Sequence, residues 1–231
     1  MSDGYFKWEY VIDYFPELLK KLPVTLSIVL IATVVGCILG GIIAFIRIER
    51  IPVLNQIAIV FISYVRGTPI LVQMFIVYYG FVMFFQSIGI NIALWDRIWF
   101  IYITYSTNIS GFLAEIFRGA INSVPKKQMD AAISIGHTRV QAYFRVIVPQ
   151  SIVIALPTLG YTIIALFQDS TLAFIFGIVD VIGEVSHLAG STGHMLEGYL
   201  DAAIIFACIS ILLEKLFGYL EKKTYHQLKV V

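Results

Sequence analysis

Two polar residues stand where the surrounding sequence is apolar, and their side chains could bind a small polar solute. Asn108 lies midway through one long apolar run, and Asp169 closes another. Polar groups at membrane depth are energetically costly and usually face a bundle interior or a water-filled cavity. Asp169 could pair with an ammonium group, and Asn108 could hydrogen-bond a carboxylate. The alternative role for both residues is an interhelical hydrogen bond.

A second feature is an interruption of another apolar run, at Arg66-Gly67-Thr68-Pro69. The glycine and the proline disturb helical hydrogen bonding and leave backbone groups unpaired. At membrane depth such groups are tolerated only where they are buried in protein or line a water-filled cavity. Exposed N–H and C=O groups there could bind an α-carboxylate or an α-ammonium group. The alternative is a proline kink, with the Arg66 side chain snorkelling to the interface.

A third feature is a short segment of small and charged residues between two apolar runs, containing Asp130, Ala131, Ala132 and Gly136. The residues from Lys126 to about position 135 fit a short amphipathic helix, and Gly136 permits a sharp turn after it. The two alanines would let another backbone approach closely, and Asp130 offers one charge-assisted contact. We expect a docking site here. The alternative is an ordinary basic loop that only satisfies topology.

The composition places these residues in a membrane protein. Of the 231 residues, 59% are hydrophobic and 13% are charged, and the mean hydropathy is +0.86. Soluble domains are roughly 45–50% apolar and about 25% charged, and the apolar residues here fall in long uncharged runs. The net charge of +1 excludes bulk electrostatic attraction to nucleic acid.

The apolar runs predict an all-α fold in which one domain, 1–231, crosses the membrane five times, because about 20 apolar helical residues span a bilayer core of about 30 Å. The predicted spans are residues 24–46, 66–86, 98–118, 147–168 and 200–220, with a loop at 119–146. Residues 6–22 are amphipathic and rich in aromatic side chains, which predicts a helix lying in the membrane interface.

The distribution of lysine and arginine predicts the orientation of the chain. With the N-terminus outside, the outer segments hold only Lys7, Lys20, Lys21 and Arg97. The inner segments then hold the basic residues at positions 47, 50, 118, 126, 127, 139, 145, 215, 222, 223 and 229. The positive-inside rule prefers this orientation. It places the C-terminus and the 119–146 loop in the cytoplasm, where ATP is.

The remaining charged and histidine residues do not predict an active site. The sequence has no Gly-x-x-x-x-Gly-Lys-Ser/Thr loop for ATP and no His-Glu-x-x-His or Gly-x-Ser-x-Gly motif. His187 and His194 lie in a glycine-rich outer segment, and their spacing does not indicate converging metal ligands. Glu115 and Arg118 are three residues apart on one helix face, which predicts a structural salt bridge.

The segment 128–136, followed by Pro149, resembles the cytoplasmic coupling loop of permease subunits in ATP-binding-cassette (ABC) importers. In those importers this loop receives force from an ATPase subunit. Asp130 stands where the family usually has Glu, and Val148 stands where it usually has Leu. The acidic residue, the alanine pair, the glycine and the proline are all at the expected places.

Further segments resemble the polar amino-acid branch of these permeases, the histidine, glutamine and cystine permease family. They are residues 64–80, residues 114–125 and residues 168–173, with Gln168 in place of the branch's Lys. The resemblance extends from about Leu22 to Tyr219, which is most of the chain.

The resemblance implies a five-helix bundle of the type I ABC importer permease kind, with an N-terminal interfacial helix and a short cytoplasmic coupling helix. It implies a multi-pass protein of the bacterial plasma (inner) membrane, in contact with lipid, that works with a second, identical or homologous permease subunit. Two ATP-binding subunits would carry ATP and Mg, and an extracytoplasmic amino-acid-binding protein would deliver the substrate. The chain itself would be no enzyme and hold no cofactor, metal or nucleic acid.

The resemblance also implies a site and a substrate class. Arg66–Pro69, Asn108, Thr162 and Asp169 would contact substrate between two permease subunits, and Asp130 to Gly136 would couple to the ATPase. Some members that bind cationic amino acids carry an acidic residue where this chain has Thr162, so arginine and lysine are less favoured. Residues 51–54 and 61–69 look most like permeases of the cystine-import group. The expected function is ATP-driven import of a polar amino acid, with cystine as a candidate.

An ATP-independent channel or secondary carrier for small polar solutes is the alternative function. The odd number of predicted spans, the absence of an internal inverted repeat and the docking segment argue against it. Transport that requires an ATPase partner would separate the two functions.

Overall fold

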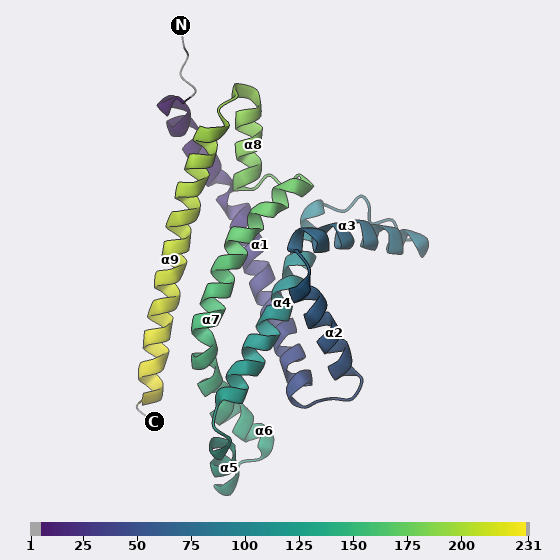
Figure 1. Ribbon diagram of the computed structural model, residues 1–231, viewed down its shortest axis with the longest axis vertical. Coiled ribbons are helices and arrows are strands. Elements are labelled where there is room, and N and C mark those ends of the chain that lie inside the picture. The colour runs from purple at the N-terminus through teal and green to yellow at the C-terminus, as the bar shows by residue number, and fades with distance from the viewer. Residues whose placement is uncertain (1–5, 230–231) are drawn as a thin grey trace.

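The computed structural model describes the backbone of residues 6–229 and the side chains of residues 6–225. All regular elements within 6–229 are helical, which confirms the all-α fold. The longest helices, α1, α4, α7 and α9, run along the molecule and pack together (Figure 1). The elements are α1 (Trp8–Ile48), α2 (Leu54–Gly67), α3 (Ile70–Ser87), α4 (Arg97–Ser123), α5 (Lys126–Ser134), α6 (Arg139–Ala142), the π-helical turn η1 (Tyr143–Ile147), α7 (Val148–Asp169), the 3-10 segment η2 (Ser170–Phe176), α8 (Val181–Thr192) and α9 (Met195–Lys229).

Helix α4 lies at the centre of the bundle and packs against α1, α2, α3 and α7. Its buried stripe contains Ile101, Tyr105, Ile109 and Leu113, each at most 2% exposed. These residues recur every four positions, so they share one face of the helix. In lipid, close packing rather than hydrophobic burial holds such helices together.

The contact between α1 and α4 depends on two glycines. A Cβ added to Gly36 would lie 2.3 Å from Ile109 Cγ2, and one added to Gly40 would lie 2.9 Å from Leu113 Cβ. The two backbones therefore approach more closely than any side chain at these positions would allow. This Gly-x-x-x-Gly spacing is a known signature of helix pairs in membranes.

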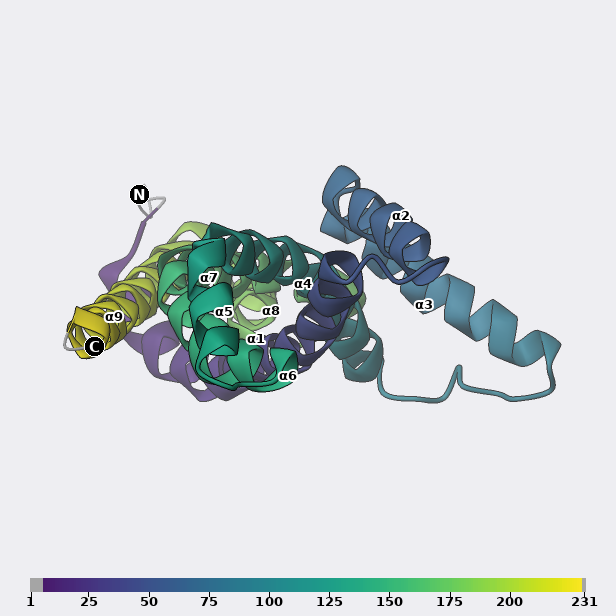
Figure 2. The ribbon, with the colours of Figure 1, turned by 90° about the horizontal axis from the view of Figure 1, so that it is seen from below.

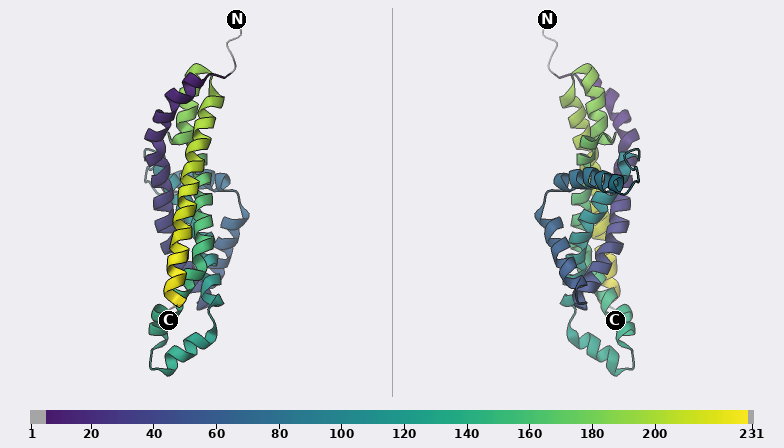
Figure 3. Two further views of the ribbon diagram at one scale, coloured as in Figure 1. Left: turned by 90° about the vertical axis from the view of Figure 1, so that its left-hand side faces the viewer. Right: turned by 90° about the vertical axis from the view of Figure 1, so that its right-hand side faces the viewer.

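Helix α1 is continuous from Trp8 to Ile48, a length of about 60 Å at 1.5 Å per residue. The separate interfacial helix expected at residues 6–22 is therefore not formed. Instead, Leu18 is fully buried in a small core with Val181 of α8 and Ile205 of α9. Figure 3 shows α8 and the beginning of α9 beside the first turns of α1. These helices give residues 8–22 a protein surface to pack against, while Trp8 and Ile12 stay 67% and 72% exposed.

Helices α2 and α3 form an arm on one side of the bundle. Helix α3 runs across the long axis of the molecule and projects beyond the other helices (Figures 1 and 2). Of its residues, only Gln73 and Met74 are buried. The predicted span 66–86 thus begins at the end of α2, crosses the break at Thr68 and Pro69, and continues as α3.

Three stretches of the part of the chain that the structure describes are long and apolar enough to cross a membrane. They are Trp8–Ile48, Ile70–Ser87 and Arg139–Phe176. The predicted spans 24–46 and 147–168 fall within the first and the third. The predicted spans 98–118 and 200–220 fall on α4 and α9, and they stay predictions.

Candidate functional site

The break between α2 and α3 is held by a buried glutamine. Thr68 and Pro69 both have extended backbone conformations, so the last carbonyl groups of α2 lose their helical partners. The side chain of Gln73, which is 3% exposed, replaces these hydrogen-bond partners. Its Nε2 donates to the carbonyl oxygens of Val65 (2.9 Å) and Thr68 (3.1 Å), and it lies 2.9 Å from Thr68 Oγ1.

Asn108 connects this break to the central helix. Its Nδ2 donates to Gln73 Oε1 at 3.0 Å. We call Gln73, Thr68 and Asn108 the clasp, because their side chains join α2, α3 and α4. The expected proximity of Asn108 to Gly67–Pro69 is thus present within this chain. The sequence analysis missed Gln73, although a glutamine within the uncharged run 67–95, whose only glutamines are Gln73 and Gln86, was a signal for it.

The other residues of the break leave their polar groups near the surface of the chain. Gly67 is exposed, and a Cβ added to it would meet open space. Arg66 is exposed, with its guanidinium carbon 5.8 Å from the centre of the Phe112 ring. Thr68 Oγ1 donates to Tyr64 O at 2.8 Å. A ligand could therefore reach the Arg66 charge and the backbone at Gly67.

Asp169 contacts the central helix α4 through its backbone. Its backbone oxygen accepts a hydrogen bond from the Tyr105 hydroxyl at 2.5 Å, and Asp169 as a whole is exposed. Tyr105 precedes Asn108 by three residues on α4, which is a rise of about 4.5 Å. Asp169 therefore contacts α4 through Tyr105, which lies about one turn before Asn108.

Thr162 lies further from these residues. It precedes Asp169 by seven positions on α7, a rise of about 10 Å. Its hydroxyl donates to Thr158 O at 2.8 Å within the same helix. The structure therefore joins the α2–α3 break to Asn108 of α4 and the Asp169 backbone to Tyr105 of the same helix, while no described contact joins Thr162 to them. Arg66 and Asp169 are exposed side chains of opposite charge.

The predicted docking segment forms the helix α5 and a left-handed turn after it. Gly136 has φ +94°, a conformation that glycine adopts at little cost. Its N–H donates to Ile133 O at 3.0 Å, and the His137 N–H donates to Ala132 O at 3.1 Å. These two bonds are a Schellman cap, which closes the C-terminus of a helix.

Most of α5 is available to another protein. Asp130 and Ala131 are exposed, whereas Ala132 is 4% exposed and packs inward. Ile133 and Ile135 are 46% and 78% exposed. Figures 1 and 3 show α5 at the tip of the molecule, near the C-terminal end of the bundle. An exposed apolar patch beside one carboxylate is a typical protein-binding surface.

A short relay joins α5 to the long helix α7. Thr138 and Gln141 form a reciprocal capping box that starts α6. The π-helical turn η1 follows, and α7 continues from it without a break in the helical chain. π-helical turns occur frequently at functional sites. Helical turns therefore follow one another without interruption from Arg139 into α7, whereas residues 135–138 between α5 and α6 are not helical.

The predicted salt bridge at the same end of α4 is confirmed. Arg118 Nη2 lies 2.6 Å from Glu115 Oε2, and Arg47 Nη1 of α1 lies 3.7 Å from Glu115 Oε1. The Glu115 carboxylate thus forms ion pairs with arginines from two helices. The Glu115–Arg118 pair expected from the spacing is therefore present, and Arg47 adds a second cation to it.

The opposite end of the bundle contains buried acidic residues with structural roles. His194 Nδ1 lies 2.8 Å from Glu197 Oε1, and the His194 ring stacks on Tyr10. Within 6–225 no group of histidine, cysteine and acidic residues converges on a metal. Asp180 caps α8 by accepting from the Gly183 N–H at 2.8 Å. Burial raises the pKa of the Asp180 carboxyl to about 6.

Known proteins with the same arrangement are transport components. Residues 32–225 match the family described as "Binding-protein-dependent transport system inner membrane component". The chain is 39% identical over 211 residues to the L-cystine transport system permease protein TcyL of Bacillus subtilis (strain 168), which covers 91% of this chain and 88% of that protein. It is 38% identical to the probable amino-acid permease protein YxeN of the same organism, over 94% of this chain and 97% of that protein.

A solved structure supports the same comparison. The protein described as "Crystal structure of an amino acid ABC transporter with histidines" matches with a TM-score of 0.83 at 28% sequence identity. The match covers 96% of this chain and 100% of that chain. The arrangement of α1 to α9 is therefore shared over almost the whole length of both proteins.

Proposed function

Because this chain belongs to the family of binding-protein-dependent transport system inner membrane components, we propose that it forms the transmembrane pathway of an ATP-driven importer for polar amino acids. The chain is a permease subunit and not itself an enzyme. The observation that carries the proposal is α5, an exposed and capped helix that connects α4 to α7. Those two helices also carry Asn108 and Asp169, so the docking helix is directly linked to the polar residues of the site.

The proposed substrate site lies at the clasp. Arg66 would pair with a carboxylate and Asp169 with an ammonium group of the substrate, and Gly67–Pro69 and Asn108 would add polar contacts. Both charged residues are exposed on this chain, so a second permease subunit would complete the cavity. Thr162 would line the pathway about two turns below Asp169.

Cystine is the proposed substrate. It has two ammonium and two carboxylate groups and no net charge near neutral pH. A site with one cationic and one anionic side chain matches this charge pattern. Thr162 adds no negative charge, unlike an acidic residue at that position, and this disfavours a cationic amino acid. The name of TcyL, an L-cystine transport permease, supports the same substrate.

The proposed cycle moves access from one side to the other through α5. An ATPase subunit docks against the exposed residues Asp130 and Ala131 and pulls on α5 when ATP closes it. Ala132 was expected to take part, but it packs on the inner side of α5 and supports the helix instead. Gly136 and η1 transmit this movement to α7, whose far end holds Asp169. Two ATPase subunits with bound ATP and Mg, a second permease copy and an extracytoplasmic binding protein complete the assembly. The chain lies in the bacterial inner membrane with its N-terminus outside and its C-terminus inside.

The test is uptake into proteoliposomes that contain this chain, its ATPase and its binding protein. Labelled cystine, glutamine, arginine and histidine are offered with and without internal ATP. We expect ATP-dependent accumulation of cystine above the other three. Accumulation of another amino acid would overturn the proposed substrate but keep the importer.

The alternative function predicts a different result in the same experiment. An ATP-independent channel or secondary carrier would pass solute in liposomes that contain this chain alone. If such a flux occurred and the ATPase subunit did not change it, the protein would be a channel or secondary carrier and the importer proposal would be wrong.

A further inference from the structure

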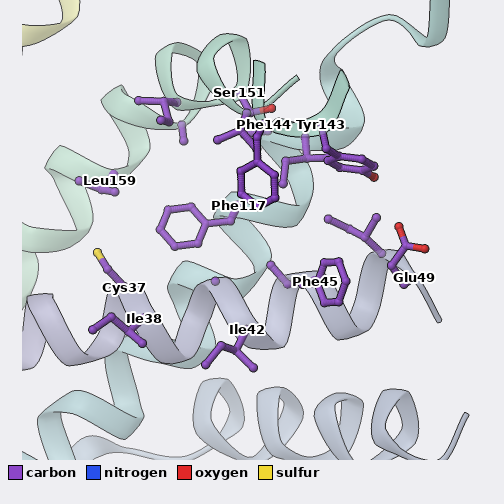
Figure 4. Close-up of a pocket in the computed structure, with 18 of the residues that line it drawn as sticks. Cys37, Ile38, Ile42, Phe45, Glu49, Phe117, Tyr143, Phe144, Ser151 and Leu159 are labelled. Carbon is purple, nitrogen blue, oxygen red and sulfur yellow. The ribbon is translucent and has the colours of Figure 1, made fainter. Parts of the chain in front are cut away.

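A groove on the α5 side of the bundle has no role in the proposed cycle. It has a volume of about 770 Å³ and lies between α1, the end of α4, and the turn from α6 through η1 into α7. Figure 4 shows the rings of Phe117 and Phe144 directed into it, with Ile42 and Phe45 of α1 on the opposite wall. Its lining is almost entirely apolar; Glu49 and Arg139 are the charged residues among those that line it.

The length of the groove matches one leaflet of a membrane. It extends along α1 from Cys37 to Glu49, which is about 18 Å at 1.5 Å per residue. Half of a bilayer core of about 30 Å is about 15 Å. The apolar wall therefore covers the depth of one leaflet, and the charged residues lie at its aqueous end.

The groove is long and lined almost entirely by apolar side chains, which suits an extended hydrocarbon chain. A helix of a second copy is the competing occupant, which a cross-link between Cys37 and that copy would reveal.

The groove opens onto a stripe of α1 that faces away from the protein. Leu30, Val34, Ile38, Ile42 and Phe45 recur at helical spacing, and each is between 52% and 64% exposed. The last three also line the groove. Under the proposed membrane placement this stripe is open to lipid, so the groove is continuous with a surface that a hydrocarbon chain can reach.

The aqueous end of the groove presents a cation. The Arg139 side chain is 70% exposed and lies 3.5 Å from Glu49 Oε1. A guanidinium has five N–H donors, so donors remain for a second anionic group in addition to the Glu49 carboxylate. Arginine binds phosphate well because its planar fork offers paired donors.

From these observations we propose that the groove binds a phospholipid of the leaflet next to α5, with an acyl chain along α1 and the phosphate at Arg139. The proposal rests on the membrane placement given under the proposed function. The bound chain contacts Tyr143 and Phe144 of η1, which lie between the docking helix and α7. The lipid therefore braces the turns through which movement of α5 reaches α7.

The test uses phosphatidylglycerol with a photoactivatable group in its acyl chain, in liposomes that contain the whole transporter. Cross-linked peptides are located by mass spectrometry.

Gly41 lines the groove, and a Cβ there meets open space, so Gly41→Trp fills the groove without a backbone clash. Gly218 of α9 has equally open surroundings, so Gly218→Trp is the matched control. We expect Gly41→Trp to reduce labelling of residues 37–49 and 139–159 at least fivefold, and Gly218→Trp to leave it unchanged.

Two further experiments test whether the phosphate group or only the acyl chain is responsible for the labelling of the groove. Arg139→Gln should reduce the preference for phosphatidylglycerol over phosphatidylcholine at least twofold, and a free fatty acid should compete poorly. Equal labelling of the groove and of α9, or displacement by free fatty acid alone, would overturn the proposal. A cross-link between Cys37 and a second copy would also overturn it.

The same liposomes report on the proposed function separately. ATP-dependent uptake without specific groove labelling would leave the importer intact and remove the lipid site. Specific groove labelling without ATP-dependent uptake would support the lipid site and contradict the importer.

Discussion

At the scale of single residues, the clasp makes the strongest prediction. Gln73→Leu leaves the carbonyl groups of Val65 and Thr68 without their donor, and a buried unpaired polar group costs about 1–3 kcal/mol. We expect a lower melting temperature in detergent and at least a tenfold loss of ATP-dependent uptake. Gln86 is exposed near the end of the same helix, so Gln86→Leu is the control. Equal behaviour of the two variants would show that the clasp does not hold the α2–α3 break.

A second residue-scale prediction concerns pH and Asp180. Burial raises the pKa of its carboxyl from the ordinary 3.8 to about 6, so the folded chain binds this proton more tightly than the unfolded chain. The proton's contribution to stability is fully present below pH 4 and is lost as the pH rises to about 6. Asp180→Asn keeps the helix cap and removes the titration.

Melting temperatures at pH 5 and pH 7.5 test this prediction. We expect the difference between them to be smaller in Asp180→Asn than in the parent, by an amount equivalent to about 1 kcal/mol, because about one unit of the shifted pKa range lies between pH 5 and pH 6. The same difference in both proteins would mean that Asp180 is charged throughout the range.

At the scale of helices, the α1–α4 contact makes a prediction with a control one residue away. Gly40→Leu would force a side chain against Leu113 and Ser110 O, which separates the two helices. A Cβ on Gly41 meets nothing within 4 Å, so Gly41→Leu should be tolerated. Overpacking of this kind costs typically 1–3 kcal/mol. We expect Gly40→Leu alone to lower the melting temperature and the yield of folded protein, and similar losses in both variants would contradict the close approach.

The docking helix makes the second prediction at this scale. Gly136→Pro cannot adopt φ +94° and loses the N–H that caps α5, while Asp130→Lys reverses the exposed charge. We expect both variants to insert into the membrane normally and to lose most ATP-dependent uptake. Membrane fractionation and proteoliposome uptake check the two parts separately. Normal uptake in both variants would show that α5 is not the docking site of the ATPase subunit.

At the scale of the whole molecule, the two ends of the bundle should face opposite sides of the membrane. The exposed Ser134 of α5 and Ser191 of α8 lie at opposite ends. In a background without Cys37 and Cys208, Ser191→Cys should react with a membrane-impermeant maleimide in intact cells. Ser134→Cys should react only after the membrane is opened. The reverse pattern would invert the proposed orientation.

Several features of this protein were determined by the sequence alone. Long uncharged runs with few polar residues required a helical membrane protein, because backbone groups in lipid must be paired within the helix. The positions of Gly136 and Asp130 predicted a capped helix, since a left-handed turn and an exposed charge depend on local residue types. The Glu115–Arg118 pair was predictable for the same reason, because the spacing on one helix fixes the contact.

Other features were decided only by the tertiary structure, because they depend on neighbours that are distant in sequence. Residues 8–22 are as amphipathic as an interfacial helix, yet α8 and α9 provide a protein surface that makes them the start of α1. The role of Gln73 depends on the break and on Asn108, 35 residues away. Local composition fixed which residues are polar or apolar, whereas the packing of the helices fixed which of them meet.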